Sequence, residues 1–206
     1  MSFYERHKSV LQKIDGLFLG NTVLERGLVV APVIVVSTSL KNSLTIAIAY
    51  AIITFLTVFC TSFLPKKLPY TIRVILCVLF ASIVYIPIAY FFEKVFPFAV
   101  YEVGIFLPLL VANSLIVRKS ETRFFTQKRS AMTVDLLCSI VGFMLVICLI
   151  GTVRELLGSG TVWDIPLSGH RLPGILFPFS GFILVGFCSA ALQKLRLRLT
   201  ENKEKE

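Results

Sequence analysis

The sequence predicts an all-α integral membrane protein, with six membrane segments arranged as a 3+3 inverted repeat. The first observation is composition: 56% of the 206 residues are hydrophobic, 16% are charged, and the mean hydropathy is +0.83. A soluble domain carries about 25% charged residues. The second observation is the order of the apolar segments, which runs short, long, long and then repeats. The third is an uneven distribution of the basic residues along the chain.

Two short apolar segments, 28–39 and 104–117, each contain a proline, Pro32 and Pro108. A helix through about fifteen residues would cover only about 20 Å of a hydrocarbon core that is about 30 Å thick. Short, proline-interrupted segments at matching places in two halves mark the centre of an inverted-repeat membrane protein. We therefore expect two proline-broken half-helices, with Asn113 satisfying backbone groups that the break frees. A simple kink in a core helix is the alternative.

Four longer apolar segments can each cross a bilayer as a helix. They cover residues 43–64, 72–92, 133–153 and 174–192. With the short segments they form a predicted membrane domain, residues 21–193, whose inverted halves are 21–97 and 98–193. A charged cytoplasmic tail, 194–206, follows it.

Residues 1–20 precede the membrane domain and lack the compact apolar run of a cleavable signal peptide. Their apolar side chains fall on one helical face: Val10, Leu11, Ile14, Leu17 and Phe18. We expect either an amphipathic helix on the cytoplasmic leaflet or a helix that docks on partner subunits.

The basic residues gather on one side of the membrane if the six segments alternate in direction. That side holds 17 of the 21 Lys and Arg residues, and the other holds only Lys41, Lys94, Arg154 and Arg171. Such asymmetry places both termini in the cytoplasm. It also explains the net charge of +9 as a feature of topology, so nucleic-acid binding is not expected.

Three charged residues lie near the ends of the predicted spans. Asp135 falls in the first turns of its helix, where a carboxylate suits the positive end of the helix dipole, with an ion-path role as the alternative. Arg154 and Glu155 are adjacent, so their side chains point about 100° apart on a helix. Either one binds a partner helix, or the two form a solvated pair at the membrane interface. The glycines that follow are typical of a helix C-cap, and Trp163 of an interfacial anchor.

Metal and catalytic motifs are absent from the sequence. The five cysteines are separated and show no CxxC spacing: Cys60, Cys77, Cys138, Cys148 and Cys188. Buried free cysteine explains all five, and the two histidines, His7 and His170, lie outside the predicted spans. No phosphate-binding loop or hydrolase triad is present, so we do not expect this chain to be catalytic alone.

Several of these segments together resemble a known family, the small six-span subunits of bacterial Rnf and Nqr complexes. The resemblance rests on residues 21–24, the Pro32 segment, 104–113, Glu121, 134–135 and the run 154–161. It is strongest to the E subunit of Rnf or the D subunit of Nqr. The resemblance implies a membrane subunit of a redox-driven, ion-translocating electron transport complex in the bacterial cytoplasmic membrane. The implied partners are a homologous six-span subunit and larger flavin-bearing subunits.

The resemblance also implies a [2Fe–2S] cluster shared between the paired subunits, with cysteines beside each half-helix motif. In this sequence those positions are Ala31 and Ser114. Because iron–sulfur clusters are held by thiolates, we expect no metal ligand from this chain. An alternative is a cofactor-free transporter or scaffold that kept the inverted-repeat fold. No charged residue lies near the middle of any span, which argues against a stand-alone transporter.

Overall fold

The computed structural model describes residues 34–63, 69–113, 116, 129–163, 165–167 and 171–204. Three helices in this part of the chain are long and apolar enough to cross a membrane. They are α3 (Leu40–Thr61), α4 (Tyr70–Val95) and α8 (Arg129–Gly158). They confirm the predicted long segments 43–64, 72–92 and 133–153. The six-span count, the inverted repeat and the domain boundaries stay predictions.

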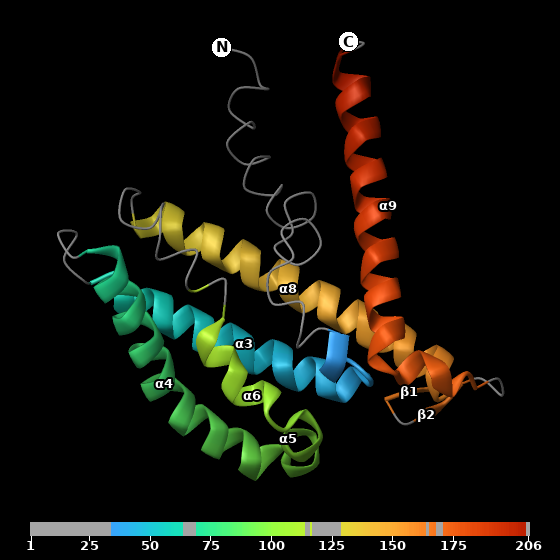
Figure 1. Cartoon of the computed structure of the whole chain (residues 1–206), viewed down its shortest axis with the longest axis horizontal. Coiled ribbons are helices and arrows are strands. Elements are labelled where there is room, and N and C mark those ends of the chain that lie inside the picture. The colour runs from blue at the N-terminus through green and yellow to red at the C-terminus, as the bar shows by residue number, and fades with distance from the viewer. Residues whose placement is uncertain are drawn as a thin grey trace.

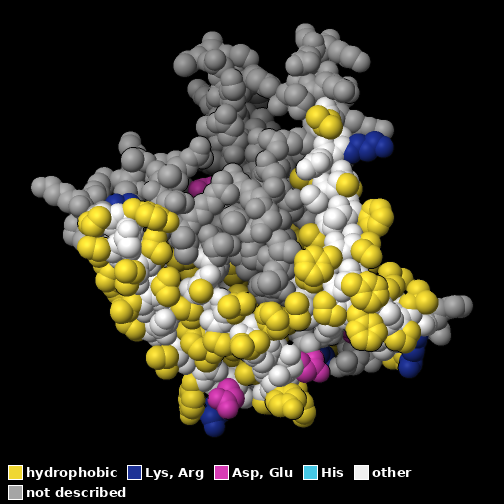
Figure 2. All heavy atoms as spheres, in the orientation of Figure 1, with side chains coloured by type: hydrophobic (Ala, Val, Ile, Leu, Met, Phe, Trp, Pro, Cys, Tyr) yellow, Lys and Arg dark blue, Asp and Glu magenta, His cyan; other side chains and the backbone are white. Residues whose placement is uncertain are grey.

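Helix α3 lies between α4 and α8 and packs against both (Figure 1). Its start adjoins the end of α8, so these two helices run antiparallel. The core between them is apolar, and the rings of Tyr50 on α3 and Phe143 on α8 stack with centroids 3.9 Å apart. Helix α4 covers the other side of α3 and exposes Ile75, Ile83 and Ile86. Figure 2 shows apolar side chains spread over the surface of α4 and α9, as expected for segments in contact with lipid or protein.

The second short segment is interrupted, but not at its proline. After α5 (Pro97–Val103) the chain turns at Gly104, whose φ of 50° suits glycine. A four-residue helix, α6 (Phe106–Leu109), and a 3-10 turn, η1 (Leu110–Ala112), follow before the extended Asn113. Pro108 lies in the first turn of α6, where a missing N–H costs little. The predicted break at Pro108 is therefore corrected to breaks at Gly104 and Asn113.

The first short segment is described only from residue 34, so Ala31 and Pro32 lie outside the described residues. Residues 34–36 are helical, and the chain turns at 37–39 before α3 begins. Ser39 is the N-cap of α3, with an extended backbone and a hydroxyl that accepts from Asn42 N at 3.3 Å. A break therefore separates this segment from α3.

The chain between α8 and the last helix forms a short hairpin that the sequence did not predict. Strands β1 (Thr161–Val162) and β2 (Ile165–Pro166) pair antiparallel. Next come a 3-10 turn, η2 (Pro173–Leu176), and helix α9 (Pro178–Glu204), which extends away from the other helices in Figure 1. The predicted segment 174–192 is thus helical from residue 178, and the helix continues into the predicted tail. Helix α9 is not among the three candidate spans.

Candidate functional site at the start of α3

Arg154, one turn before the end of α8, is completely buried. Its Nη1 donates to the carbonyls of Ile34 and Ser37, the latter at 3.1 Å, and at 3.4 Å to the Ser37 hydroxyl. These acceptors lie at the end of the helical stretch 34–36. The last carbonyls of a helix lack hydrogen-bond partners within the helix, and they carry partial negative charge. The Arg154 guanidinium donates hydrogen bonds to such carbonyls, and its positive charge interacts favourably with the helix dipole.

The other nitrogens of Arg154 bind a segment from the far end of the chain. Nε donates to Ile175 O at 3.1 Å, and Nη2 donates to the carbonyls of Leu176 at 2.7 Å and Phe177 at 3.3 Å. These carbonyls belong to η2 and the residue that follows it. One side chain therefore joins α8 to the first short segment and to the approach to α9. The planar guanidinium with its five N–H donors suits this role, whereas a lysine has a single nitrogen.

Glu155 binds the chain on the other side of the break at 37–39, where α3 begins. Its Oε2 accepts from the backbone N–H of Leu40, the first residue of α3, at 2.7 Å, and its Oε1 accepts from the Thr161 hydroxyl at 3.3 Å. The Glu155 side chain is 3% exposed. A carboxylate at a helix N-terminus is stabilised by the positive end of the dipole. Thus Arg154 holds the end of one helical segment and Glu155 the start of the next.

The expectation of a solvated interfacial pair is therefore wrong for Arg154 and Glu155. Both side chains are buried, and their hydrogen bonds run to backbone and hydroxyl groups within this chain. We call these two residues with the break at 37–39 the α3 clamp. A buried charge needs such partners, because removing them leaves it uncompensated.

Replacing Glu155 with glutamine is expected to lower the stability of the protein by about 1–2 kcal/mol. The neutral amide is a weaker acceptor for Leu40 N–H and loses the favourable interaction with the helix dipole. The thermal unfolding midpoint of the full-length protein in detergent measures the effect. The matched control is Glu93→Gln, on an exposed side chain near the end of α4. Equal midpoints for the two variants would contradict the capping role.

Asn113 lies at the middle of α3, well away from the α3 clamp. Its Nδ2 donates to Thr54 Oγ1 at 3.1 Å, and both side chains are buried. Thr54 is fourteen residues after Leu40, so about 20 Å of helix separates this contact from the clamp. The buried Tyr50 hydroxyl lies beside these two side chains without a hydrogen bond of ordinary geometry. The prediction that Asn113 satisfies freed backbone groups stays a prediction.

Asp135 lies in the second turn of α8 as the structure describes this helix, in agreement with its predicted place in the first turns. The Asp135 side chain is half-buried. The dipole explanation and the alternative ion-path role for this carboxylate both stay predictions.

A second polar contact joins α3 to α5 and was not predicted from the sequence. Asn42, buried in the first turn of α3, donates its Nδ2 to Glu102 Oε2 of α5 at 2.5 Å. Beside this pair lies a cavity of about 340 Å³ that also contacts the ends of both short segments, at Thr38 and Phe106. No pattern around Glu102 in the sequence signalled this contact.

The five cysteines lie away from the described parts of the two short segments, beside which the family resemblance places its cluster ligands. In the residues that the structure describes, no three His, Cys, Asp or Glu side chains gather as a metal site. All five cysteines lie on the long helices α3, α4, α8 and α9, and none lies on the described part of a short segment. Ala31 and Ser114 lie outside the described residues, so the loss of the cluster ligands stays a prediction.

The apolar helices, the exposed apolar faces and the two interrupted segments define a helical membrane protein. A family model described as "Rnf-Nqr subunit, membrane protein" matches residues 10–197. The chain therefore belongs to this family, which confirms the family predicted from the sequence.

Curated relatives are named as the E subunit of an ion-translocating oxidoreductase complex. The chain is 30% identical over 152 residues to that of Haemophilus ducreyi, covering 73% of this chain and 66% of the relative. It is 26% identical over 207 residues to that of Cellvibrio japonicus, covering 92% and 87%. It is 29% identical over 153 residues to that of Edwardsiella ictaluri, covering 73% and 64%. The matches to the first and third thus span about two thirds of those relatives.

Proposed function

We propose that this chain is a membrane subunit of a redox-driven, ion-translocating electron transport complex of Rnf or Nqr type. Its partners in this proposal are a homologous six-span subunit and larger flavin-bearing subunits. It resides in the bacterial cytoplasmic membrane with both termini in the cytoplasm. The relatives named as the E subunit of an ion-translocating oxidoreductase complex support the role, and the distribution of basic residues supports the orientation.

The observation that carries the proposal is the α3 clamp. Its two charged residues, Arg154 and Glu155, belong to the run 154–161 on which the resemblance to this family rests, and they hold an interrupted helix in place. The second short segment is interrupted as well, at Gly104 and Asn113. Interrupted helices in both halves suit a subunit that works at the centre of a larger membrane assembly.

Purification of the full-length tagged chain from its native membrane tests the assembly. We expect mass spectrometry to find a homologous six-span membrane protein and flavin-bearing subunits in stoichiometric amounts after mild detergent extraction. Solubilisation of an unrelated tagged multi-pass protein from the same strain gives the background. A chain that purifies alone under these conditions would reject the proposal and favour the cofactor-free transporter.

We further propose that this chain supplies no ligand to an iron–sulfur cluster. Alanine has no donor atom, and Ser114 lacks the thiolate that such clusters use. The double variant Ala31→Cys with Ser114→Cys is expected to raise the iron content of the purified complex when its partner subunit carries two cysteines. Iron analysis and EPR of the reduced complex measure the gain.

The control for this variant places two thiols elsewhere in the membrane domain. Ser82 and Ile86 lie one turn apart on the exposed face of α4, so Ser82→Cys with Ile86→Cys adds the same number of cysteines away from the short segments. This control is expected to bind no additional iron. A cluster signal that is already assigned to this subunit in the unmodified complex would reject the proposed loss of ligands.

A further inference from the structure

Hydroxyl groups are buried along one face of α3, from the middle of the helix to its end. Four such residues follow one another at spacings of three or four, which places them on the same helical face: Tyr50, Thr54, Thr57 and Thr61. The first three are 0% exposed, and we call them the hydroxyl cluster; Thr61 is 5% exposed. Because bulk water does not reach these side chains, each hydroxyl needs a hydrogen-bond partner inside the membrane domain.

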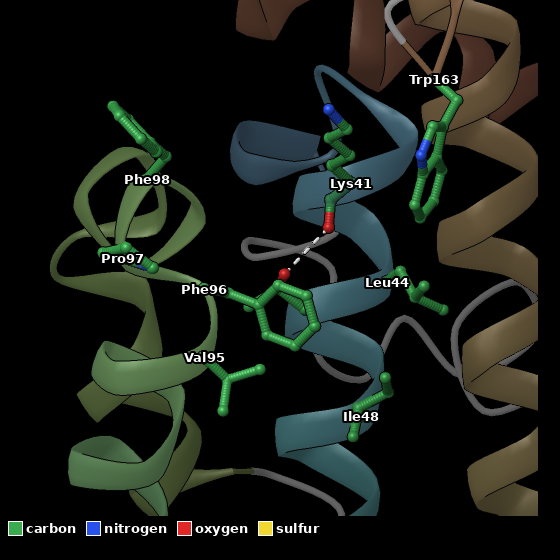
Figure 3. A pocket seen from close by; sticks show the side chains of 9 residues that line it. Lys41, Leu44, Ile48, Val95, Phe96, Pro97, Phe98 and Trp163 are labelled. Atoms are coloured by element: carbon green, nitrogen blue, oxygen red, sulfur yellow. Dashed lines mark hydrogen bonds between the residues drawn. The ribbon is translucent and has the colours of Figure 1, made fainter.

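Two threonines of α3 outside the hydroxyl cluster use the backbone of their own helix for this purpose. The Thr45 hydroxyl donates to the carbonyl of Lys41 at 2.9 Å, which is the dashed line in Figure 3. The Thr61 hydroxyl donates to the carbonyl of Val58 at 3.0 Å. A bond of this kind, to a carbonyl three or four residues earlier, satisfies a threonine hydroxyl in a helix without any other group.

Two members of the hydroxyl cluster lack such a bond. Neither Thr57 Oγ1 nor the Tyr50 hydroxyl makes a hydrogen bond with the residues that the structure describes. The Tyr50 hydroxyl lies beside Thr54 and Asn113, without a hydrogen bond of ordinary geometry to either. A buried hydroxyl without a partner is costly, and ordered water is a common partner of such groups in native proteins.

The spacing of Thr54 and Thr57 fits one bridging water. Side chains three residues apart on a helix have Cβ atoms about 5–6 Å from each other, a distance that two hydrogen bonds of about 2.8 Å through one water can span. Thr54 Oγ1 accepts from Asn113 Nδ2 at 3.1 Å, which leaves its own proton for another acceptor. These side chains are neutral and would give a cation no counter-charge, whereas a water matches hydroxyls both as donor and as acceptor.

We propose that a water molecule is bound between the hydroxyls of Thr54 and Thr57, inside the membrane domain, with the Tyr50 hydroxyl as its third partner. Three hydrogen bonds are typical of a buried structural water. The site joins α3 to the end of the second short segment, because Thr54 also binds Asn113. It joins α3 to α8 as well, because the Tyr50 ring stacks on Phe143. The proposal concerns a structural site and is independent of the electron-transport role.

Thr57→Val tests the proposal through the sign of its effect, because valine keeps the shape of threonine and removes only the hydroxyl. If the water is bound, it loses a partner, and the unfolding midpoint of the full-length chain in detergent should fall by about 2–4 °C. If the Thr57 hydroxyl is simply unpaired, its removal should raise the midpoint. Thr61→Val is the matched control on the same buried face, and little change is expected because its hydroxyl bonds only within the helix.

Tyr50→Phe removes the third partner and keeps the ring that stacks on Phe143. Tyr50 and Thr57 are two turns apart on α3, so the two hydroxyls are coupled mainly through the water that they share. Either substitution weakens the same water site, and the two shifts should therefore not add. We expect the midpoint of the double variant to lie no lower than that of the less stable single variant.

The unmodified chain gives a direct observation. A density map that resolves ordered waters in the membrane domain, from the chain alone or in its native assembly, is expected to show a peak about 2.7–3.0 Å from both Thr54 Oγ1 and Thr57 Oγ1. Four results would overturn the proposal: no such peak, a midpoint that does not fall in Thr57→Val, an equal fall in Thr61→Val, or additive shifts in the double variant. If Thr57→Val does not yield folded protein, the map decides.

Discussion

Replacing Arg154 with methionine is expected to destabilise the protein by about 3–5 kcal/mol, enough to abolish the folded state of a marginally stable membrane domain. Methionine fills much of the same volume, but it donates no hydrogen bond. The buried carbonyls of Ile34, Ser37 and Leu176 then lose the hydrogen-bond donor that Arg154 supplies. The recovery of monodisperse full-length protein after detergent extraction, and its unfolding midpoint, measure the loss.

Two further variants show whether the geometry of the guanidinium matters. Arg154→Lys keeps the charge but places it on one nitrogen, so we expect it to recover only part of the stability. Arg171→Met removes a guanidinium from an exposed position in the segment before η2 and is expected to have little effect. If Arg154→Met and Arg171→Met behave alike, Arg154 does not hold the break.

The long helices could be predicted because a run of about twenty apolar residues has few alternatives in a membrane. The helix ends were less predictable. Helix α8 extends from the apolar run back to Arg129, the first residue of this helix that the structure describes. The interruption at Gly104 was not predicted, because the break was assigned to Pro108 instead. Pro108 lies in the first turn of α6, where a proline does not remove a helical hydrogen bond.

The two charged residues of the α3 clamp could be identified in the sequence, but their burial and their hydrogen-bond partners could not be predicted from it. Arg154 and Glu155 stood out as charges at the end of an apolar segment. Their burial depends on acceptors and donors that are distant in the chain: Ile34 lies 120 residues from Arg154, and Leu40 lies 115 residues from Glu155. The antiparallel packing of α3 on α8 brings these groups together. The sequence near Arg154 and Glu155 does not contain this information, so it predicted two solvated side chains.

Replacing Gly151 with alanine is expected to destabilise the protein by about 1–3 kcal/mol, because α3 and α8 approach closely at this residue. A Cβ on Gly151 would lie 2.9 Å from the Cβ of Ser43 and 3.1 Å from the carbonyl of Ser39, with the Ser43 hydroxyl nearer still. Gly151 is one turn before Glu155, on the same face of α8. Small residues of this kind let two membrane helices approach each other.

The matched control is Gly186→Ala in α9, where a Cβ would meet no atom within 4 Å. There the gain in helix propensity should stabilise the protein by up to about 1 kcal/mol. Ser43→Gly removes both side-chain atoms that obstruct Gly151→Ala, so the double variant should recover stability relative to Gly151→Ala alone. The unfolding midpoints of the unmodified chain, the two single variants and the double variant form a double-mutant cycle, and Gly186→Ala is the control. We expect a coupling free energy of about 0.5–3 kcal/mol between positions 43 and 151. No coupling, or a stabilising Gly151→Ala, would show that the start of α3 does not rest against α8 as closely as the clamp requires.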